Sequence, residues 1–250
     1  MKALILAAGQ GIRLGSITKK LPKALLEVCN TPLLKNSLDI LCECGIYDIG
    51  IVVGYLADQI RNKIGNSYKG ARITYFENMR YAETNNIVSL FSAEKFCDDN
   101  MILLECDLLY NKNIILELME SKAECCIAVS PFDSLTMNGT IIKVKDNGIV
   151  DSLILGEWQN KGHDYSKFYK TVNIYYFNKN FINNKYMPLI KWYVENMGEK
   201  IYYEKVLGSL IYYHECEVCS LIVNKDKWQE IDNESDLKSA EKKYNEILNS

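Results

Sequence analysis

The 250-residue sequence has little net charge and no long apolar run. Its net charge is −3 at pH 7, so we expect no basic surface of the kind that binds nucleic acid. No stretch approaches the roughly 18 consecutive apolar residues of a membrane-spanning helix. The N-terminus lacks the charged and then apolar regions of a secretion signal. These absences favour a soluble cytoplasmic protein with no nucleic-acid or membrane partner.

Two familiar glycine-loop signatures are also absent. The string G-x-x-x-x-G-K-[ST] of a P-loop does not occur. A dinucleotide-binding loop would need a glycine three residues after Gly11, and that position is Leu14. The sequence therefore excludes a P-loop protein and disfavours a dehydrogenase.

Histidine is scarce, and the sequence offers little for a zinc site. The segment His214-x-Cys216-x-x-Cys219 has ligand-like spacing, but no second Cys/His pair lies nearby to complete it. We interpret both histidines, His163 and His214, as surface or structural residues. Most of the nine cysteines sit in apolar runs, which is typical of small buried hydrophobic residues in a reducing compartment.

The chain opens with an apolar stretch that ends in a glycine-rich turn. Residues 3–8 are all apolar, which predicts a strand covered on both faces. Gly9 and Gly11 follow, and they remove side chains where backbone N–H groups can approach a ligand. Arg13 and Lys23 bring two cations toward the same turn. A small-residue turn with two cations suits a polyphosphate.

The rest of the first half alternates between apolar strands and amphipathic helices. We predict strands at residues 48–54, 72–76 and 101–107, and helices at residues 32–44, 56–64, 86–93 and 113–121. This βα alternation predicts a parallel sheet with helices on both faces.

After residue 122 the pattern changes to antiparallel pieces. A hairpin is predicted around Asp146-Asn147-Gly148. We predict further strands at residues 123–130, 168–177 and 217–223, a helix at 181–194 that is broken near Pro188, a helix at 202–213 and a last helix that ends at Leu248.

Three polar segments interrupt this apolar pattern. The loop at residues 78–86 follows a strand's carboxyl end, where open α/β sheets bind ligands, and its amides can read a base. Asp107 ends a buried strand, where a carboxylate can hold a metal. Lys170, Thr171 and Asn173 lie in an apolar strand, so we expect them to face a ligand or one another. The alternatives are an ordinary turn, a helix cap and a solvated sheet face, respectively.

Together these motifs resemble one family. The segment Leu6-Ala7-Ala8-Gly9-x-Gly11-x-Arg13, followed by Leu21-Pro22-Lys23, is similar to the signature of nucleotidyltransferases that couple an NTP to a phosphorylated acceptor. Residues 81–87, residues 169–175 and Trp228-x-Glu230-Ile231-Asp232 narrow the resemblance to a CTP-dependent branch. That branch contains phosphocholine, 2-aminoethylphosphonate and phosphoglutamine cytidylyltransferases, and the last, which serve capsular phosphoramidate synthesis, match best.

The resemblance implies an α/β fold and a reaction. The fold is a Rossmann-like mixed, mostly parallel sheet flanked by helices, with a small antiparallel acceptor-binding portion. We expect one domain over residues 1–250, in which residues 1–122 mainly bind nucleotide and residues 123–250 mainly bind the acceptor. The implied reaction is Mg²⁺-dependent transfer of CMP from CTP to a small phosphorylated or phosphonate acceptor, best matched by L-glutamine phosphate, with release of pyrophosphate.

Alternatives remain for the acceptor and the nucleotide. They are phosphocholine, 2-aminoethylphosphonate, a sugar 1-phosphate used with UTP or dTTP, and a non-catalytic nucleotide-binding role. Choline would need an aromatic cage, for which Tyr169, Tyr175 and Tyr203 are candidates. A primary amine or amino acid would need carboxylates, for which Glu204 and Glu217 are candidates.

The family's roles carry over to matching positions. Arg13 and Lys23 match the catalytic cations, and Asp107 and Asp232 match the two metal carboxylates. The expected nucleotide-binding residues are Leu6, Ala8, Gly9, Gly11, Tyr81, Glu83, Thr84 and Asn86. The expected acceptor-binding residues are Tyr169, Lys170, Asn173 and Glu204.

Two further features lie in the second half. The loop at residues 156–167 is a candidate lid, because it is polar and carries aromatic residues; its notable side chains are Trp158, Lys161, His163 and Tyr165. The tyrosine-rich C-terminal half is a candidate homodimer face.

Overall fold

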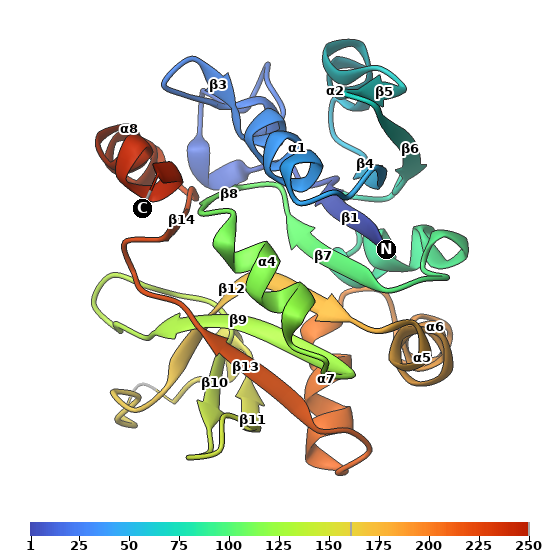
Figure 1. Cartoon of the computed structure of the whole chain (residues 1–250), viewed down its shortest axis with the longest axis vertical. Coiled ribbons are helices and arrows are strands. Elements are labelled where there is room, and N and C mark those ends of the chain that lie inside the picture. Colours follow the sequence, from blue (N-terminus) through green and yellow to red (C-terminus); the bar gives the residue numbers. More distant parts are fainter. Residues whose placement is uncertain (161, 250) are drawn as a thin grey trace.

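The computed structural model describes residues 1–160 and 162–249 and shows one central mixed sheet with helices packed against it (Figure 1). The strand order is β11-β10-β12-β7-β1-β4-β6-β5, and β9 and β13 continue from β12 on a second path. This arrangement confirms the predicted fold class.

The first half supplies the parallel part of the sheet. Its strands are β1 (Lys2–Ala7), β4 (Asp48–Val53), β6 (Ala71–Glu77) and β7 (Met101–Glu105), with the short antiparallel β5 (Ser67–Tyr68) at the edge. The second half supplies β9 (Cys125–Pro131), β10 (Ile141–Val144), β11 (Val150–Ile154), β12 (Tyr169–Phe177) and β13 (Val218–Ile222). Strand β12 joins the two parts, because it pairs antiparallel with both β7 and β9.

The helices begin and end close to the predicted positions. They are α1 (Leu33–Glu43), α2 (Ala57–Ile64), α3 (Asn86–Ser92), α4 (Asn113–Glu120), α5 (Lys179–Phe181), α6 (Met187–Asn196), α7 (Tyr203–Tyr212) and α8 (Glu234–Asn249). Asn85 caps α3, because its side chain accepts a hydrogen bond of 2.8 Å from the Asn86 N–H. The helix break that was predicted near Pro188 lies just before that residue. A π-helical turn, η5 (Ile182–Tyr186), separates α5 from α6, and Pro188 itself fits in the first turn of α6.

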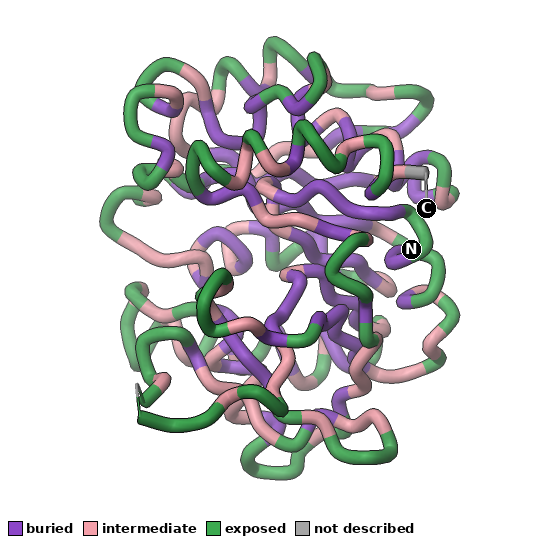
Figure 2. The backbone as a smooth tube through the Cα atoms, turned by 90° about the vertical axis from the view of Figure 1, so that its left-hand side faces the viewer, coloured by how far each residue is buried: buried purple, intermediate pink, exposed green. Residues whose placement is uncertain are grey.

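Strand β1 is covered on both faces, as its unbroken apolar sequence predicts. Ala3 and Ile5 belong to a core cluster with residues of α1 and α4, whereas Leu4 and Leu6 belong to a second cluster with residues of α3, α6 and α7. Successive side chains of a strand point to opposite faces, so a strand buried on both sides must be apolar throughout. Figure 2 shows the buried strands running through the middle of the molecule.

Strand β12 departs from the regular alternation that its sequence suggests. Asn173 has a φ of +60°, and the register of β12 against β9 shifts between Thr171 and Tyr175. This bulge turns the strand, so Lys170 and Asn173 line the same cavity although they are three residues apart. In a regular strand, residues three apart would lie on opposite faces, so the bulge is what places both side chains at one cavity.

A two-stranded ladder joins the C-terminal segment to the end of β7. Strand β14 (Trp228–Glu230) pairs antiparallel with β8 (Leu108–Tyr110), with Glu230 opposite Leu108. The Ile231 N–H donates to the Asp107 carbonyl at 2.9 Å, which fixes Asp232 beside Asp107. Figure 1 shows this segment leading into α8, which packs on the loops around β2 (Glu27–Val28) and β3 (Thr31–Pro32).

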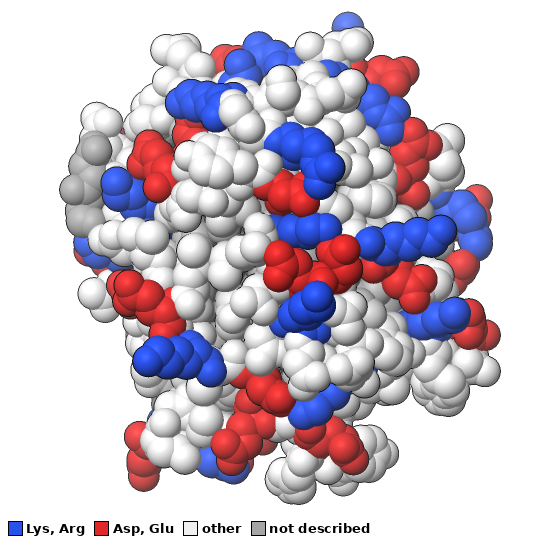
Figure 3. All heavy atoms as spheres, turned by 45° about the vertical axis from the view of Figure 1, so that its right-hand side comes forward, with Lys and Arg blue, Asp and Glu red and all other residues white. Residues whose placement is uncertain are grey.

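The helices and one face of the surface bear on what a membrane or a charged partner would require. None of the helices within residues 1–160 and 162–249 is long and apolar enough to cross a bilayer. On the face shown in Figure 3, acidic and basic side chains are interspersed.

Candidate active site

Three connected hollows lie at the carboxyl ends of β1 and β7. The large cavity measures about 960 Å³ and extends over residues of the second half. The turn pocket, about 350 Å³, lies over Gly9, Gly11 and Lys23, and the loop pocket, about 230 Å³, lies against residues 78–86. Glu105 at the end of β7 lines all three. Open α/β sheets bind ligands at this edge.

The glycine turn after β1 is built differently at its two glycines. Gly11 has a φ of +62°, and a Cβ there would lie 3.2 Å from the Lys23 Cβ and from the Thr18 Cγ2. The Thr18 hydroxyl donates to the Gly11 carbonyl at 2.9 Å. A Cβ at Gly9 would meet no atom within 4 Å. Gly11 is therefore required by the packing of the turn itself, whereas Gly9 leaves its backbone open to a ligand.

Lys23 lies buried between two carboxylates from distant parts of the chain. Its Nζ is 2.5 Å from Asp107 Oδ2 and 2.8 Å from Asp232 Oδ1. The Arg13 Nη2 also reaches Asp232 Oδ1, at 2.8 Å. Burial alone would lower the pKa of Lys23, but the charges and hydrogen bonds of Asp107 and Asp232 outweigh it and raise that pKa above its ordinary value. Lys23 is therefore a permanent cation at neutral pH.

The same place gathers carboxylates that suit a divalent cation. Oxygen atoms of Asp107, Glu230 and Asp232 lie within 4.8 Å of one another. Asp107 Oδ1 is buried without a hydrogen-bond partner, so this oxygen is free to bind a ligand. Hard oxygen donors are the ligands that Mg²⁺ prefers. The residues present therefore fit the metal that the resemblance implied.

Glu230 is a site residue that the sequence reading did not assign. Its spacing from Asp232 could have identified it, because residues i and i+2 of an extended segment point to the same side. Burial raises its pKa above the ordinary value; the Lys170 charge opposes this shift, and the charges of Asp107 and Asp232 add to it. Glu105 was missed as well, although it stands two residues before Asp107 at the end of the same strand.

Polar side chains of β12 contact one another on the wall of the large cavity. Lys170 is 2% exposed, and its Nζ lies 3.3 Å from Glu230 Oε2 and donates to the Thr171 carbonyl at 2.9 Å. The Asn173 amide donates to Glu230 Oε1 at 3.0 Å, and the Thr171 hydroxyl donates to Asn173 Oδ1 at 2.9 Å. This network holds Lys170 and Asn173 at the cavity.

A second pair of carboxylates lies around Asn86. The Asn86 Nδ2 is 3.3 Å from Glu204 Oε2 and 3.5 Å from Glu105 Oε1, and Asn86 Oδ1 accepts from the Tyr203 N–H at 3.0 Å. Glu204 lies in the first turn of α7 and is 6% exposed. Burial raises the pKa of both carboxyl groups above the ordinary value.

Most of the expected nucleotide-binding residues line these hollows. The turn pocket and the loop pocket together are lined by seven of them: Leu6, Ala8, Gly9, Gly11, Tyr81, Thr84 and Asn86. Glu83 is the one expected nucleotide-binding residue that does not line them. Its side chain is 72% exposed and faces Arg80 at 3.6 Å, so it lines none of the three hollows.

Tyr169, which was expected to bind the acceptor, also lies away from the hollows. It packs against an apolar core cluster and, unlike Lys170 beside it, lines none of the three hollows. Tyr175 and Tyr203 are fully buried in an aromatic cluster with Phe177, so their rings are also closed to an acceptor. Adjacent strand residues point to opposite faces, which is why Lys170 and Tyr169 cannot share a wall.

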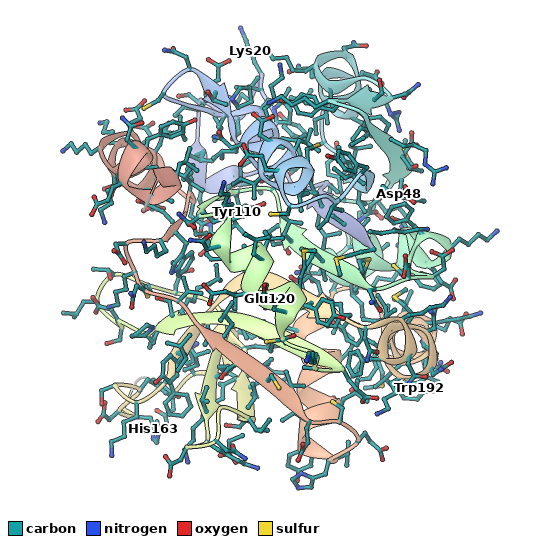
Figure 4. All side chains as sticks on the ribbon, viewed as in Figure 1. Lys20, Asp48, Tyr110, Glu120, His163 and Trp192 are labelled. Atoms are coloured by element: carbon teal, nitrogen blue, oxygen red, sulfur yellow. The ribbon has the colours of Figure 1, made fainter. Side chains whose placement is uncertain are left out.

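The candidate lid contributes to the large cavity. From this loop between β11 and β12, Gly156, Gln159, His163 and Tyr165 are among the lining residues, and Lys161 lies outside the described residues. His163, labelled in Figure 4, is at the lower edge of the molecule. Whether the loop closes remains a prediction.

One known protein resembles this chain over nearly its whole length, and another resembles about half of it. CMP-5'-(3-aminopropyl)phosphonate synthase from Streptomyces rubellomurinus is 27% identical over 247 residues, which cover 98% of this chain and 39% of that protein. CTP:phosphoglutamine cytidylyltransferase from Campylobacter jejuni is 33% identical over 135 residues, which cover 52% of each. The chain thus spans well under two thirds of the length of these two relatives.

A solved structure shows the same fold. The CTP:phosphocholine cytidylyltransferase of Streptococcus pneumoniae superposes with a TM-score of 0.79 at 24% identity, over 96% of this chain and 97% of that one. The predicted resemblance to the CTP-dependent cytidylyltransferases is confirmed by these relatives. The family model of the MobA-like NTP transferase domain matches residues 3–152. This match covers more than half of the sequence, and the chain therefore belongs to the MobA-like NTP transferase family.

Proposed function

We propose that the protein is a Mg²⁺-dependent cytidylyltransferase that transfers CMP from CTP to a small phosphorylated or phosphonate acceptor and releases pyrophosphate. One observation carries the proposal. Lys23 is buried between Asp107 and Asp232 beside a glycine turn whose backbone is open at Gly9. Cations and paired carboxylates at an open backbone turn suit a metal-bound triphosphate.

The reaction is an in-line displacement at the α-phosphorus of CTP. An acceptor oxygen forms a bond to that phosphorus, the bond to the bridging oxygen of the β-phosphate breaks, and pyrophosphate leaves. The acceptor oxygen is already an anion, so no general base is required. Repulsion between two anionic substrates is the main obstacle, and positioning with charge compensation lowers it.

The charged residues of the turn pocket meet this requirement. Arg13 and Lys23 bring two positive charges to the wall of the turn pocket, where the triphosphate would lie. Asp107 and Asp232, with Glu230 close by, would hold Mg²⁺. When bound there, the ion would supply further positive charge to the triphosphate oxygens.

The loop pocket is the proposed site of the base. Asn78 is 3% exposed, and its amide donates to the Thr84 and Ser89 hydroxyls at 3.1 Å each. These contacts hold a small polar wall next to the turn pocket. A pyrimidine base placed there would leave its phosphates over Gly9.

The large cavity is the proposed acceptor site. Lys170 is its buried cation, and we assign it to the phosphorus oxyanions of the acceptor. L-glutamine phosphate is the acceptor that the sequence motifs favour, and one relative is named for it. Phosphocholine and 2-aminoethylphosphonate are the alternatives within the same class.

A matrix of nucleotides and acceptors tests the proposal. Pyrophosphate release is measured with CTP, UTP and dTTP, each with Mg²⁺ and with L-glutamine phosphate, phosphocholine, 2-aminoethylphosphonate or glucose 1-phosphate. We expect turnover with CTP that depends on a non-sugar acceptor. Lys23→Ala and Asp107→Asn, checked for folding by circular dichroism, should each lower turnover by about 10²-fold or more. Near-native pyrophosphate release in both variants would sink the assignment.

A further inference from the structure

The carboxylates that would hold a divalent cation already face cations of the chain itself. Asp107 Oδ2 and Asp232 Oδ1 share the Lys23 ammonium, at 2.5 and 2.8 Å. Glu230 Oε2 faces the Lys170 ammonium at 3.3 Å. A carboxylate that forms an ion pair attracts a further cation only weakly, because its partner repels that cation. The protein's own lysines therefore weaken the attraction of this site for a metal.

Lys23 and a divalent cation would compete for the same two carboxylates. Mg²⁺ binds carboxylate oxygens at about 2.0–2.1 Å, so an ion on Asp107 or Asp232 would lie within a few ångströms of the Lys23 ammonium. Even an ion on Asp107 Oδ1, the buried oxygen without a hydrogen-bond partner, would share its carboxylate with that ammonium. Two cations this close repel each other, and burial strengthens the repulsion because water and salt screen it less.

The ammonium of Lys23 has a second place within its reach. The base of the side chain is fixed by packing, because a Cβ at Gly11 would lie 3.2 Å from the Lys23 Cβ and 3.5 Å from its Cδ. The ammonium itself sits at the end of a flexible four-carbon stem. Lys23 lines the turn pocket, where the backbone is open at Gly9. Triphosphate oxygens in that pocket would give the ammonium new anionic partners, so it can leave the carboxylates when a nucleotide is bound.

We propose, on the basis of the function proposed above, that Lys23 is a built-in counter-cation at Asp107 and Asp232 that keeps a divalent cation from binding there ahead of the nucleotide. Removing the ammonium then has opposite effects on two measurements. Metal binding to the nucleotide-free protein becomes tighter, whereas turnover falls because the triphosphate loses a cation. A lysine with only a structural role would not tighten metal binding when it is removed.

The experiment measures Mn²⁺ binding to the nucleotide-free protein by electron paramagnetic resonance, which detects the free ion. Lys23→Met and Lys23→Gln remove the charge, and circular dichroism checks their folding. We expect a millimolar or weaker Kd for the wild type and at least about tenfold tighter binding by both variants. Adding Asp107→Asn to Lys23→Met should abolish this gain, which locates it at the proposed site. Lys185→Met is the matched control, because Lys185 also pairs with a carboxylate, that of Glu124, at 2.8 Å; it should bind Mn²⁺ as the wild type does.

Three results would overturn the role of Lys23. They are equal Mn²⁺ affinity of the wild type and both Lys23 variants, a gain that survives Asp107→Asn, and the same gain in Lys185→Met. If neither Lys23 variant folds, the wild type decides: a micromolar Kd that Asp107→Asn abolishes overturns the proposal, and a millimolar or weaker Kd supports it. These titrations contain no CTP and no acceptor. Absence of pyrophosphate release with every substrate pair would therefore overturn the proposed function and leave the Mn²⁺ comparison to decide this inference separately.

Discussion

Lys23 is the residue on which the two halves of the site depend. Its ammonium group is shared by Asp107, at the end of β7, and Asp232, from the C-terminal segment. The carboxylates are 16% and 8% exposed, so without Lys23 the buried Asp107 would lose its cation and Asp232 would keep only the exposed Arg13. The residue therefore stabilises the fold as well as the proposed transition state.

Lys23→Met and Arg13→Met should separate these two contributions. We expect Lys23→Met to lower the free energy of unfolding by about 3–5 kcal/mol, because it leaves the buried Asp107 unpaired and Asp232 with only the exposed Arg13. Arg13 is 63% exposed, so Arg13→Met should change that free energy little while it lowers turnover. Urea unfolding followed by circular dichroism measures the first effect and pyrophosphate release the second. Equal stability of the two variants would contradict the role of the Lys23 ion pairs.

Individual site residues were predictable to different degrees. Motif matching identified Lys23, Asp107 and Asp232 as site residues, and the structure brings them together. It misplaced Glu83, since a motif position says nothing about which way an exposed loop side chain points. It missed Glu105, because a carboxylate at a strand end becomes informative only when Asn86 and Glu204 are seen beside it.

The turn after β1 is the element that brings the backbone close to the ligand. Gly11 is strained for any other residue, because its φ is +62° and an added Cβ would approach Lys23. Gly9 has neither constraint. The turn can therefore be altered at one glycine without disturbing its own packing.

Gly9→Ala and Gly11→Ala should affect different properties, the first CTP binding and the second stability. We expect Gly9→Ala to keep the melting temperature and raise the KM for CTP, since its methyl group would project where the phosphates approach. Gly11→Ala should lower the free energy of unfolding by about 1–2 kcal/mol through backbone strain. Thermal unfolding and CTP titration of pyrophosphate release check both. A Gly9→Ala variant with an unchanged KM for CTP would argue against a phosphate site at this turn.

Elements were easier to predict than their irregularities. The apolar runs identified β1, β4 and β7 because burial on both faces requires them. The bulge at Asn173 left no trace in the alternation of β12, although it decides which side chains share a wall. The three-residue pairing of β8 with β14 was equally invisible, since strands this short have too few positions to show a period.

At the scale of the whole molecule, the site is closed by segments from both ends of the chain. Arg13 and Asp232 are 219 positions apart in the sequence, yet Arg13 Nη2 lies 2.8 Å from Asp232 Oδ1. The site therefore forms only when the C-terminal segment has docked beside β7. Burying acidic groups there costs free energy, and this cost should lower the stability of the whole folded protein.

The pH dependence of stability tests this cost. Burial raises the pKa of Glu204 in the folded protein, so the folded state binds that proton more tightly than the unfolded state. Stability must then fall as the pH rises from about 4.3 through the raised pKa. Glu204→Gln cannot ionise, so its melting temperature should gain on the wild type over this range and differ least below it. Scans from pH 4 to 8 measure the difference, and a pH-independent difference would contradict the account.

The most direct test of the central claim follows the α-phosphate of CTP. The wild type is incubated with Mg²⁺, CTP labelled at its α-phosphate, and 2-aminoethylphosphonate. The products are then separated and identified by mass spectrometry. The account predicts that the label moves into a CMP–acceptor adduct with one pyrophosphate released per adduct, and that Lys23→Met forms about 10²-fold less. Label that stays in CTP, or appears only as free CMP with that acceptor and with L-glutamine phosphate and phosphocholine alike, would contradict it.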